Sequence, residues 1–161
     1  MSTPFHDAAS VTIQNLEAAF AGESMAHIKY RYFAKLCRAA GDEATAKVFE
    51  DTAEQELLHA FGHADLLFPP ARMSPAKALQ LAIDGETHEY TEMYPQFKHA
   101  ALAEGQTAAA QELDEQIAES KAHADMFRAV LEKAAKRFSA LAKVEERHAN
   151  HYIATLARVN G

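Results

Sequence analysis

The scarcity of helix-breaking residues is the feature that most constrains this chain. Its 161 residues include only six Gly and five Pro, and neither residue occurs between Gly105 and Gly161. Between the breakers, apolar residues recur at the three- and four-residue spacing of an amphipathic helix, and strong helix formers such as Ala, Glu, Leu and Lys are frequent. We therefore expect an all-α protein, of a length that suits one domain.

The breakers divide the chain into helical segments. We expect helices over about 10–40 and 43–68, separated at Gly41, then a linker over about 69–75. A third helix should run from Pro75 towards Gly105, and Pro95 is expected to kink it. The remainder is too long for one ordinary helix, so it contains either a turn or an extended rod. These segments form two helical hairpins, about 10–68 and 75–160.

Charge and cysteine content exclude several classes. A net charge of −7 argues against a nucleic-acid-binding protein, and no apolar run reaches the ~18–20 residues that span a membrane. The first ten residues lack the basic and apolar regions of a secretory signal. Cys37 is the single cysteine, which excludes a disulfide framework and a four-cysteine metal site. We expect a soluble protein of a reducing cytoplasm.

The chain also repeats itself. Residues 16–24 resemble residues 79–87 at an offset of 63, and each copy carries a Gly-Glu pair, Gly22-Glu23 and Gly85-Glu86. The first and third helices therefore look like two versions of one element. Two helical hairpins related by a pseudo-two-fold axis would place paired sites in the bundle interior.

Two Glu-x-x-His pairs carry the candidate chemistry, Glu56 with His59 and Glu145 with His148. Residues at i and i+3 leave the same face of a helix, so each pair can reach one interior point. A lone pair would most often be a solvated surface feature. Two pairs, together with single Glu residues from the other helices, follow the ligand pattern of carboxylate-bridged di-iron bundles.

Electrostatics supports a metal centre. Five interior carboxylates would be prohibitive without cations, whereas two metal ions nearly neutralise them. Oxygen and imidazole ligands suit iron, and zinc or manganese could substitute. The five residues are Glu23, Glu56, Glu86, Glu89 and Glu145.

Glu89, Tyr30 and Tyr94 each have two possible roles. Glu89 follows Glu86 by three residues and offers one metal an exchangeable ligand, or else it points to water beside Glu92. Tyr30 and Tyr94 could hydrogen-bond ligand carboxylates, or they are core tyrosines with hydroxyls at the surface.

Four segments resemble the rubrerythrin family: residues 19–27, 52–60, 85–95 and 138–148. The resemblance implies a ferritin-like four-helix bundle that reduces hydrogen peroxide to water at a di-iron site. Glu56 and Glu145 would bridge the metals, while His59 and Glu89 would exchange at one iron. The implied ligands are Glu23, Glu56, His59, Glu86, Glu89, Glu145 and His148.

The resemblance also has implications for partners. With one cysteine the chain is similar to the rubredoxin-less, sulerythrin-like branch, so it would need an external electron donor such as a rubredoxin. A homodimer is expected. The alternatives are a ferritin-like ferroxidase that handles iron, and a structural bundle with a fortuitous zinc site.

The fourth helix remains open, because a pattern occurs twice at a spacing of 25 residues. Ser120 and His123 in one copy correspond to Glu145 and His148 in the other. Gly105 precedes His123 by 18 residues, as Gly41 precedes His59, so hairpin symmetry favours His123 as the ligand. In that copy Ser120 stands where a bridging Glu is needed, and the nearest carboxylate, Glu119, lies one position early. We favour Glu145 and His148, since a bridging carboxylate is hard to replace.

Overall fold

The computed structural model describes residues 4–159, which are helical throughout apart from short turns and contain no strand. The predicted all-α class is confirmed. The chain divides between Ser74 and Pro75 into two compact units, unit 1 and unit 2. That division lies at the end of the linker expected around residues 69–75.

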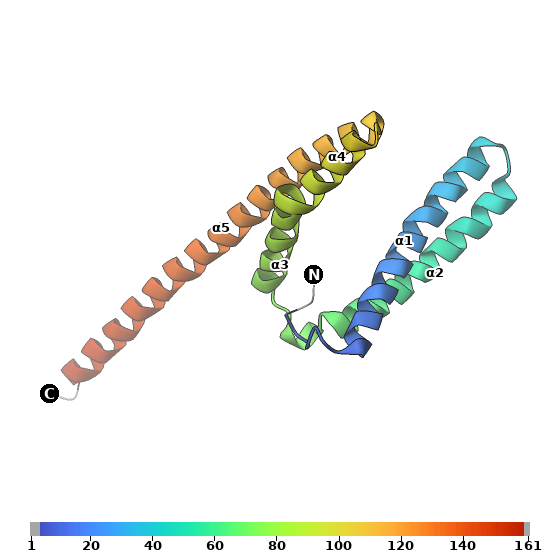
Figure 1. Ribbon diagram of the computed structural model, residues 1–161. Helices are drawn as coiled ribbons and strands as arrows, with labels where there is room; N and C mark the ends of the chain where they lie inside the picture. Colours follow the sequence, from blue (N-terminus) through green and yellow to red (C-terminus); the bar gives the residue numbers. More distant parts are fainter. Residues whose placement is uncertain (1–3, 160–161) are drawn as a thin grey trace. The chain divides into compact units, whose positions relative to one another are not determined.

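Unit 1 is a helical hairpin of α1 (Val11–Ala39) and α2 (Glu43–Leu67), which run antiparallel side by side (Figure 1). Every seventh residue of α2 is buried along the seam with α1. Three of these residues are alanines, and small side chains allow two helix backbones to approach closely. The seam positions are Ala46, Ala53, Ala60 and Leu67.

At the end of unit 1 opposite the Gly41 turn, the N-terminal segment packs against the linker. Helix α2 ends at Leu67, two residues before Pro69, and a short helix, η1 (Pro70–Arg72), follows. The buried ring of Phe5 packs edge-on against Phe68, and the guanidinium of Arg72 lies over the Phe5 ring. The N-terminal segment thus covers this end of the hairpin.

Unit 2 is a second hairpin. Its first arm consists of α3 (Pro75–His88), a π-helical turn, η2 (Glu89–Met93), and α4 (Tyr94–Ala103). Within η2 the N–H of Tyr94 donates to the carbonyl of Glu89, five residues back. Pro95 follows directly and has no N–H to donate, which accounts for an irregularity at this point. The structure therefore has a π-helical turn just before Pro95, where the sequence predicted a kink.

Both hairpins turn by the same glycine motif. Gly41 and Gly105 have left-handed backbones, with φ of 84° and 73°. In each turn the glycine N–H donates to the carbonyl three residues back, and the next N–H donates to the carbonyl five residues back, at 2.8–3.1 Å. These are the bonds of a Schellman motif, which satisfies the last carbonyls of a helix and requires the left-handed residue.

The second arm of unit 2 is α5, a continuous helix of 53 residues (Thr107–Val159). Its first half packs against α3, η2 and α4, with Ala110, Ser120 and Ala124 buried. Its second half continues beyond the other arm, with Phe138 72% exposed and Tyr152 70% exposed (Figure 1). Of the two expectations for this stretch, the rod is correct and the turn is wrong. No helix of the described residues is both long and apolar enough to cross a membrane.

Candidate metal centre

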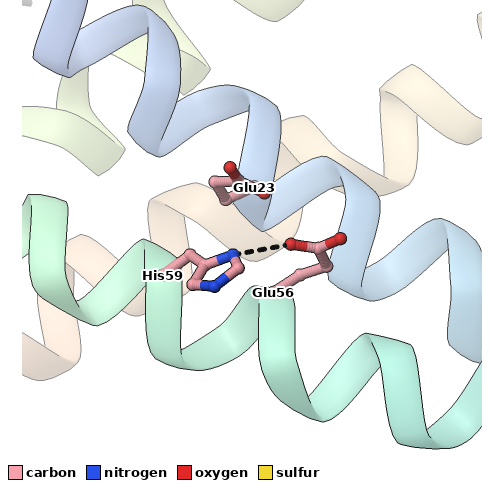
Figure 2. A group of neighbouring side chains, drawn as sticks. All are labelled: Glu23, Glu56 and His59. Atoms are coloured by element: carbon pink, nitrogen blue, oxygen red, sulfur yellow. Dashed lines mark hydrogen bonds and ion pairs between the residues drawn. The ribbon is translucent and has the colours of Figure 1, made fainter.

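Unit 1 brings three predicted ligands together. Glu23 of α1 and Glu56 and His59 of α2 each offer one ligand atom, and these atoms lie within 4.8 Å of one another. Figure 2 shows the Glu23 carboxylate above the facing side chains of Glu56 and His59. Nδ1 of His59 lies 2.9 Å from Oε2 of Glu56. The Glu that follows Gly22 and the Glu-x-x-His pair therefore lie at one place in this hairpin, and their role as metal ligands stays a prediction.

The environment of this cluster suits a cation. The Glu56 side chain is 18% exposed, so its charge is largely removed from water, while His59 is mostly exposed. A carboxylate in that position needs a compensating positive charge. Two carboxylates and an imidazole are ligands that iron, manganese and zinc accept.

Unit 2 builds a related cluster from different partners. Nδ1 of His123 in α5 lies 3.4 Å from Oε1 of Glu86 in α3. The hydroxyl of Ser120 donates a hydrogen bond of 2.9 Å to Oε2 of Glu89. Within this hairpin, Glu86 and Glu89 thus meet the first copy of the duplicated pattern.

The two hairpins correspond at several positions, at offsets of 63 and 64 residues. Glu23 and Glu86 differ by 63 in sequence, whereas His59 and His123 differ by 64. The buried seam of α2 recurs at the same offset of 64, since Ala46 and Ala60 correspond to the buried Ala110 and Ala124. The sequence repeat therefore extends to the second helix of each hairpin, as the equal 18-residue spacings from Gly41 to His59 and from Gly105 to His123 indicated.

Glu145 and His148 lie elsewhere on α5. They follow Ser120 and His123 by 25 residues, nearly seven turns, so they leave the same face of the helix about 37 Å farther along. Both are exposed, and Nδ1 of His148 lies 3.6 Å from Oε2 of Glu145. The structure does not bring them to Glu86 and Glu89 within one chain, because an unbroken α5 has no turn near Ile117 to carry them back. Their role as metal ligands stays a prediction.

The two tyrosines differ in their surroundings. Burial raises the pKa of Tyr94, and the charges of Glu89 and Glu86 raise it further. Tyr94 thus lies within electrostatic reach of both carboxylates. The ring of Tyr30 packs on Phe49 with centroids 5.9 Å apart. Tyr30 therefore occupies the aromatic part of the α1–α2 seam.

Two contacts near the site were not predicted from the sequence. Nη2 of Arg128 donates to the hydroxyl of Thr87 at 2.8 Å, and a hydrogen bond with Tyr90 raises the pKa of Arg128. These bonds tie α5 to α3 and to η2, close in sequence to Glu86. The Ser120–Glu89 bond is the second unpredicted contact. The equal 18-residue spacing from each glycine turn, which in the sequence favoured His123 as a ligand, was a signal that could have indicated it.

These clusters define a class: an all-α protein whose hairpins each bring carboxylate and imidazole groups together, in unit 1 at a spacing that could hold a metal ion. The sequence model of the rubrerythrin family matches residues 14–131. The chain belongs to the rubrerythrin family, whose members bind a di-iron centre. The matched range ends at residue 131, before the second copy of the duplicated pattern.

Individual relatives are similar over much of the chain. It is 35% identical to a rubrerythrin of Porphyromonas gingivalis over 161 residues, which cover 93% of this chain and 68% of that one. A nigerythrin of Nitratidesulfovibrio vulgaris is 38% identical over 110 residues, covering 61% of this chain and 54% of the relative. The structure of fully reduced, all-ferrous nigerythrin aligns with a TM-score of 0.40 at 32% identity, over 83% of this chain and 73% of the other. The chain thus spans about half to two thirds of these curated relatives.

Proposed function

We propose that this protein is a non-haem di-iron peroxidase that reduces hydrogen peroxide to water with electrons from an external donor. The observation that carries the proposal is the convergence of Glu23, Glu56 and His59 in unit 1. Membership of the rubrerythrin family supports it. When bound, the di-iron centre would supply the two electrons that cleave the peroxide O–O bond, and two protons complete two water molecules.

The chain's own residues would hold the metals and control the protons. Glu23, Glu56, His59, Glu86 and Glu89 are proposed as ligands, and His59 and Glu89 as the pair that exchanges when the oxidation state changes. His59 suits this role because its ring is mostly exposed and can move. Tyr94, with its raised pKa, keeps its proton at neutral pH and can donate a hydrogen bond to a carboxylate.

The test compares two uses of the same reconstituted protein. Protein loaded with ferrous iron without oxygen is expected to consume hydrogen peroxide repeatedly when a chemical reductant or a reduced rubredoxin is supplied. Iron bound per chain should stay constant during turnover. Absence of peroxide consumption by protein that contains the two irons would reject the proposal.

A second candidate is a ferritin-like ferroxidase that takes up ferrous iron and holds or transfers ferric iron. The charge of residues 1–131 favours it, because they contain twenty Asp and Glu against ten Lys and Arg, and such a surface attracts Fe²⁺. Uptake of many irons per chain, driven by oxygen, would identify this function.

The proposed partner arrangement is a homodimer in a reducing cytoplasm, consistent with a single cysteine. Residues 132–159 of α5 supply a suitable surface, since Phe138, Leu141, Tyr152, Ile153 and Leu156 are all exposed. Residues 132–161 contain six Lys and Arg against three Asp and Glu, opposite in balance to the rest of the chain. Charge therefore favours a dimer in which residues 132–159 of one copy contact the acidic residues 1–131 of the other copy. Contact between the two basic segments is less favourable.

A further inference from the structure

The contact between α5 and α3 contains a buried hydroxyl with one specific partner. Ser120 is 4% exposed, and its hydroxyl donates to Oε2 of Glu89 at 2.9 Å. A hydroxyl has a single proton to donate, and here a carboxylate accepts it. Hydrogen bonds to charged groups are shorter and stronger than those between neutral groups. The bond thus fixes Oε2 of Glu89 and leaves its other oxygen, Oε1, to bind a metal ion.

The position of Ser120 in the pseudo-symmetric hairpins is informative. At the offset of 64 that relates His59 to His123, Ser120 corresponds to Glu56. At the offset of 25 within α5, it corresponds to Glu145. By both relations a serine stands where the chain elsewhere has the Glu of a Glu-x-x-His pair.

We propose that Ser120, at the position of a metal-bridging carboxylate, is instead a positioning residue that orients Glu89, and that His123 is the metal ligand supplied by α5. The inference rests on the proposed di-iron centre and specifies how this chain departs from a five-carboxylate site. The adjacent Glu119 is exposed, because one residue along a helix turns the side chain by about 100°. Glu145 lies about 37 Å farther along the helix.

The substitution changes the charge balance of the site. Each ligand carboxylate adds one negative charge to the site, and ferric ions carry more positive charge than ferrous ions. A site with Ser120 therefore favours the reduced state relative to a site with Glu at that position, because an added negative charge stabilises the more highly charged metals. The chain should accordingly have a higher midpoint potential than its Ser120→Glu variant.

The first experiment measures metal binding by calorimetry, with Zn²⁺ and, without oxygen, with Fe²⁺. The His123→Ala variant should lose one of the two ions, or bind it at least about tenfold more weakly. The matched control is His148→Ala, which removes the same side chain from the same face of α5 and should leave both ions. The proposal is overturned if His148→Ala loses metal and His123→Ala does not.

The second experiment measures the midpoint potential of the iron-loaded protein. Ser120→Ala removes the proton donor of Glu89 and should lower both the potential and the affinity for one ion, the latter by about 10–100-fold. Ser120→Glu should lower the potential further and retain both ions. Circular dichroism checks that each variant is folded. Unchanged potentials in both folded variants would reject a positioning role for Ser120.

Neither readout depends on turnover. A wild-type protein that gives these binding and potential results but consumes no peroxide would refute the proposed peroxidase and leave the role of Ser120 intact. A wild-type protein that binds a single Zn²⁺ would refute the di-iron centre. The comparison of His123→Ala with His148→Ala would still decide which histidine binds that ion.

Discussion

Glu89 occupies an unusual position at the residue scale, because it begins the π-helical turn and accepts a hydrogen bond from Ser120 across the hairpin. π-Helical turns change the direction of the side chains that follow them and are frequent at functional sites. A carboxylate at such a turn can be anchored by one oxygen while the other approaches a metal. Its geometry suits a ligand used in only one oxidation state.

Replacing Glu89 by Ala is expected to separate metal binding from turnover. The variant should still bind two ferrous ions, because the other ligands remain, but it should lose most peroxide reduction. Stopped-flow peroxide consumption and iron analysis measure the two properties. The matched control is Glu92→Ala, an exposed carboxylate of the same turn that pairs with His88. Full turnover by Glu89→Ala would show that ligand exchange at this residue is not required.

Tyr94 provides a test of pH dependence in the metal-free protein. Its pKa in the folded state is raised by burial and by Glu89 and Glu86, so the folded state holds this proton more tightly than the unfolded state. The stabilisation is fully present below the ordinary tyrosine pKa of about 10 and is lost as the pH rises through the folded-state value. Above pH 10 the free energy of unfolding, measured with denaturant, should therefore fall more steeply with pH for the wild type than for Tyr94→Phe. Equal slopes would contradict the assigned environment.

The turns decide the hairpin geometry at the scale of elements. Gly41 and Gly105 both sit in left-handed conformations that end one helix and start the next. The following Asp42 caps α2 by accepting a hydrogen bond from the N–H of Thr45 at 3.0 Å. Hydrogen bonding with the Thr45 side chain, and then with its N–H, lowers the pKa of Asp42. Local sequence suffices for these features because each requirement involves neighbouring residues only.

Gly41→Ala should reduce the free energy of unfolding by about 1–2 kcal/mol, because an L-residue with a Cβ is strained in the left-handed region. Gly62→Ala is the control, since Gly62 lies inside α2 with nothing within 4 Å of an added Cβ. There the substitution should stabilise the protein by about 0.5–1 kcal/mol. Chemical denaturation measures both values, and equal effects at the two glycines would refute this account.

The second half of α5 makes a separate prediction about assembly. Replacing Phe138 and Tyr152 together by Ser should shift the protein from dimer to monomer, because it removes large exposed apolar side chains from the proposed docking surface. Sedimentation velocity over a range of concentrations measures the shift. Raising the salt concentration should weaken the wild-type dimer, since opposite charges contribute to it. A wild type that is monomeric at all concentrations would exclude this surface as an interface.

The whole molecule divides its predicted ligands between two compact units. Unit 1 contains Glu23, Glu56 and His59, and unit 2 contains Glu86 and Glu89 with the candidate His123. Metal that binds only the folded state stabilises it by about 2.7 kcal/mol at a hundredfold excess over its Kd.

We expect two metal ions per chain, bridged by carboxylate and about 3.5–4 Å apart. Removing them with a chelator should lower the unfolding temperature, and Glu56→Ala should weaken both ions because it removes a proposed bridging ligand. Glu54→Ala, which removes an exposed carboxylate paired with Arg31, is the control. Calorimetry and elemental analysis measure the outcome. A crystal grown with ample iron that contained one ion or none at this place would contradict the prediction.

The sequence by itself determined the helices, both glycine turns and the convergence of Glu23, Glu56 and His59, since these follow from spacing within one or two neighbouring helices. It favoured Glu145 with His148 over Ser120 with His123 on the chemistry of a bridging carboxylate, although both copies share one local pattern and the same helix face. Only the tertiary structure shows which copy lies opposite Glu86 and Glu89 within the chain, and which copy binds metal stays a prediction. The turn at Gly105 sets which residues of α5 lie opposite Glu86 and Glu89, and the first copy falls within the length of α3 and α4 while the second lies beyond it. The choice between a turn and a rod after Gly105 was decided in the same way, since an alanine- and glutamate-rich helix ends only where packing or a breaker requires it.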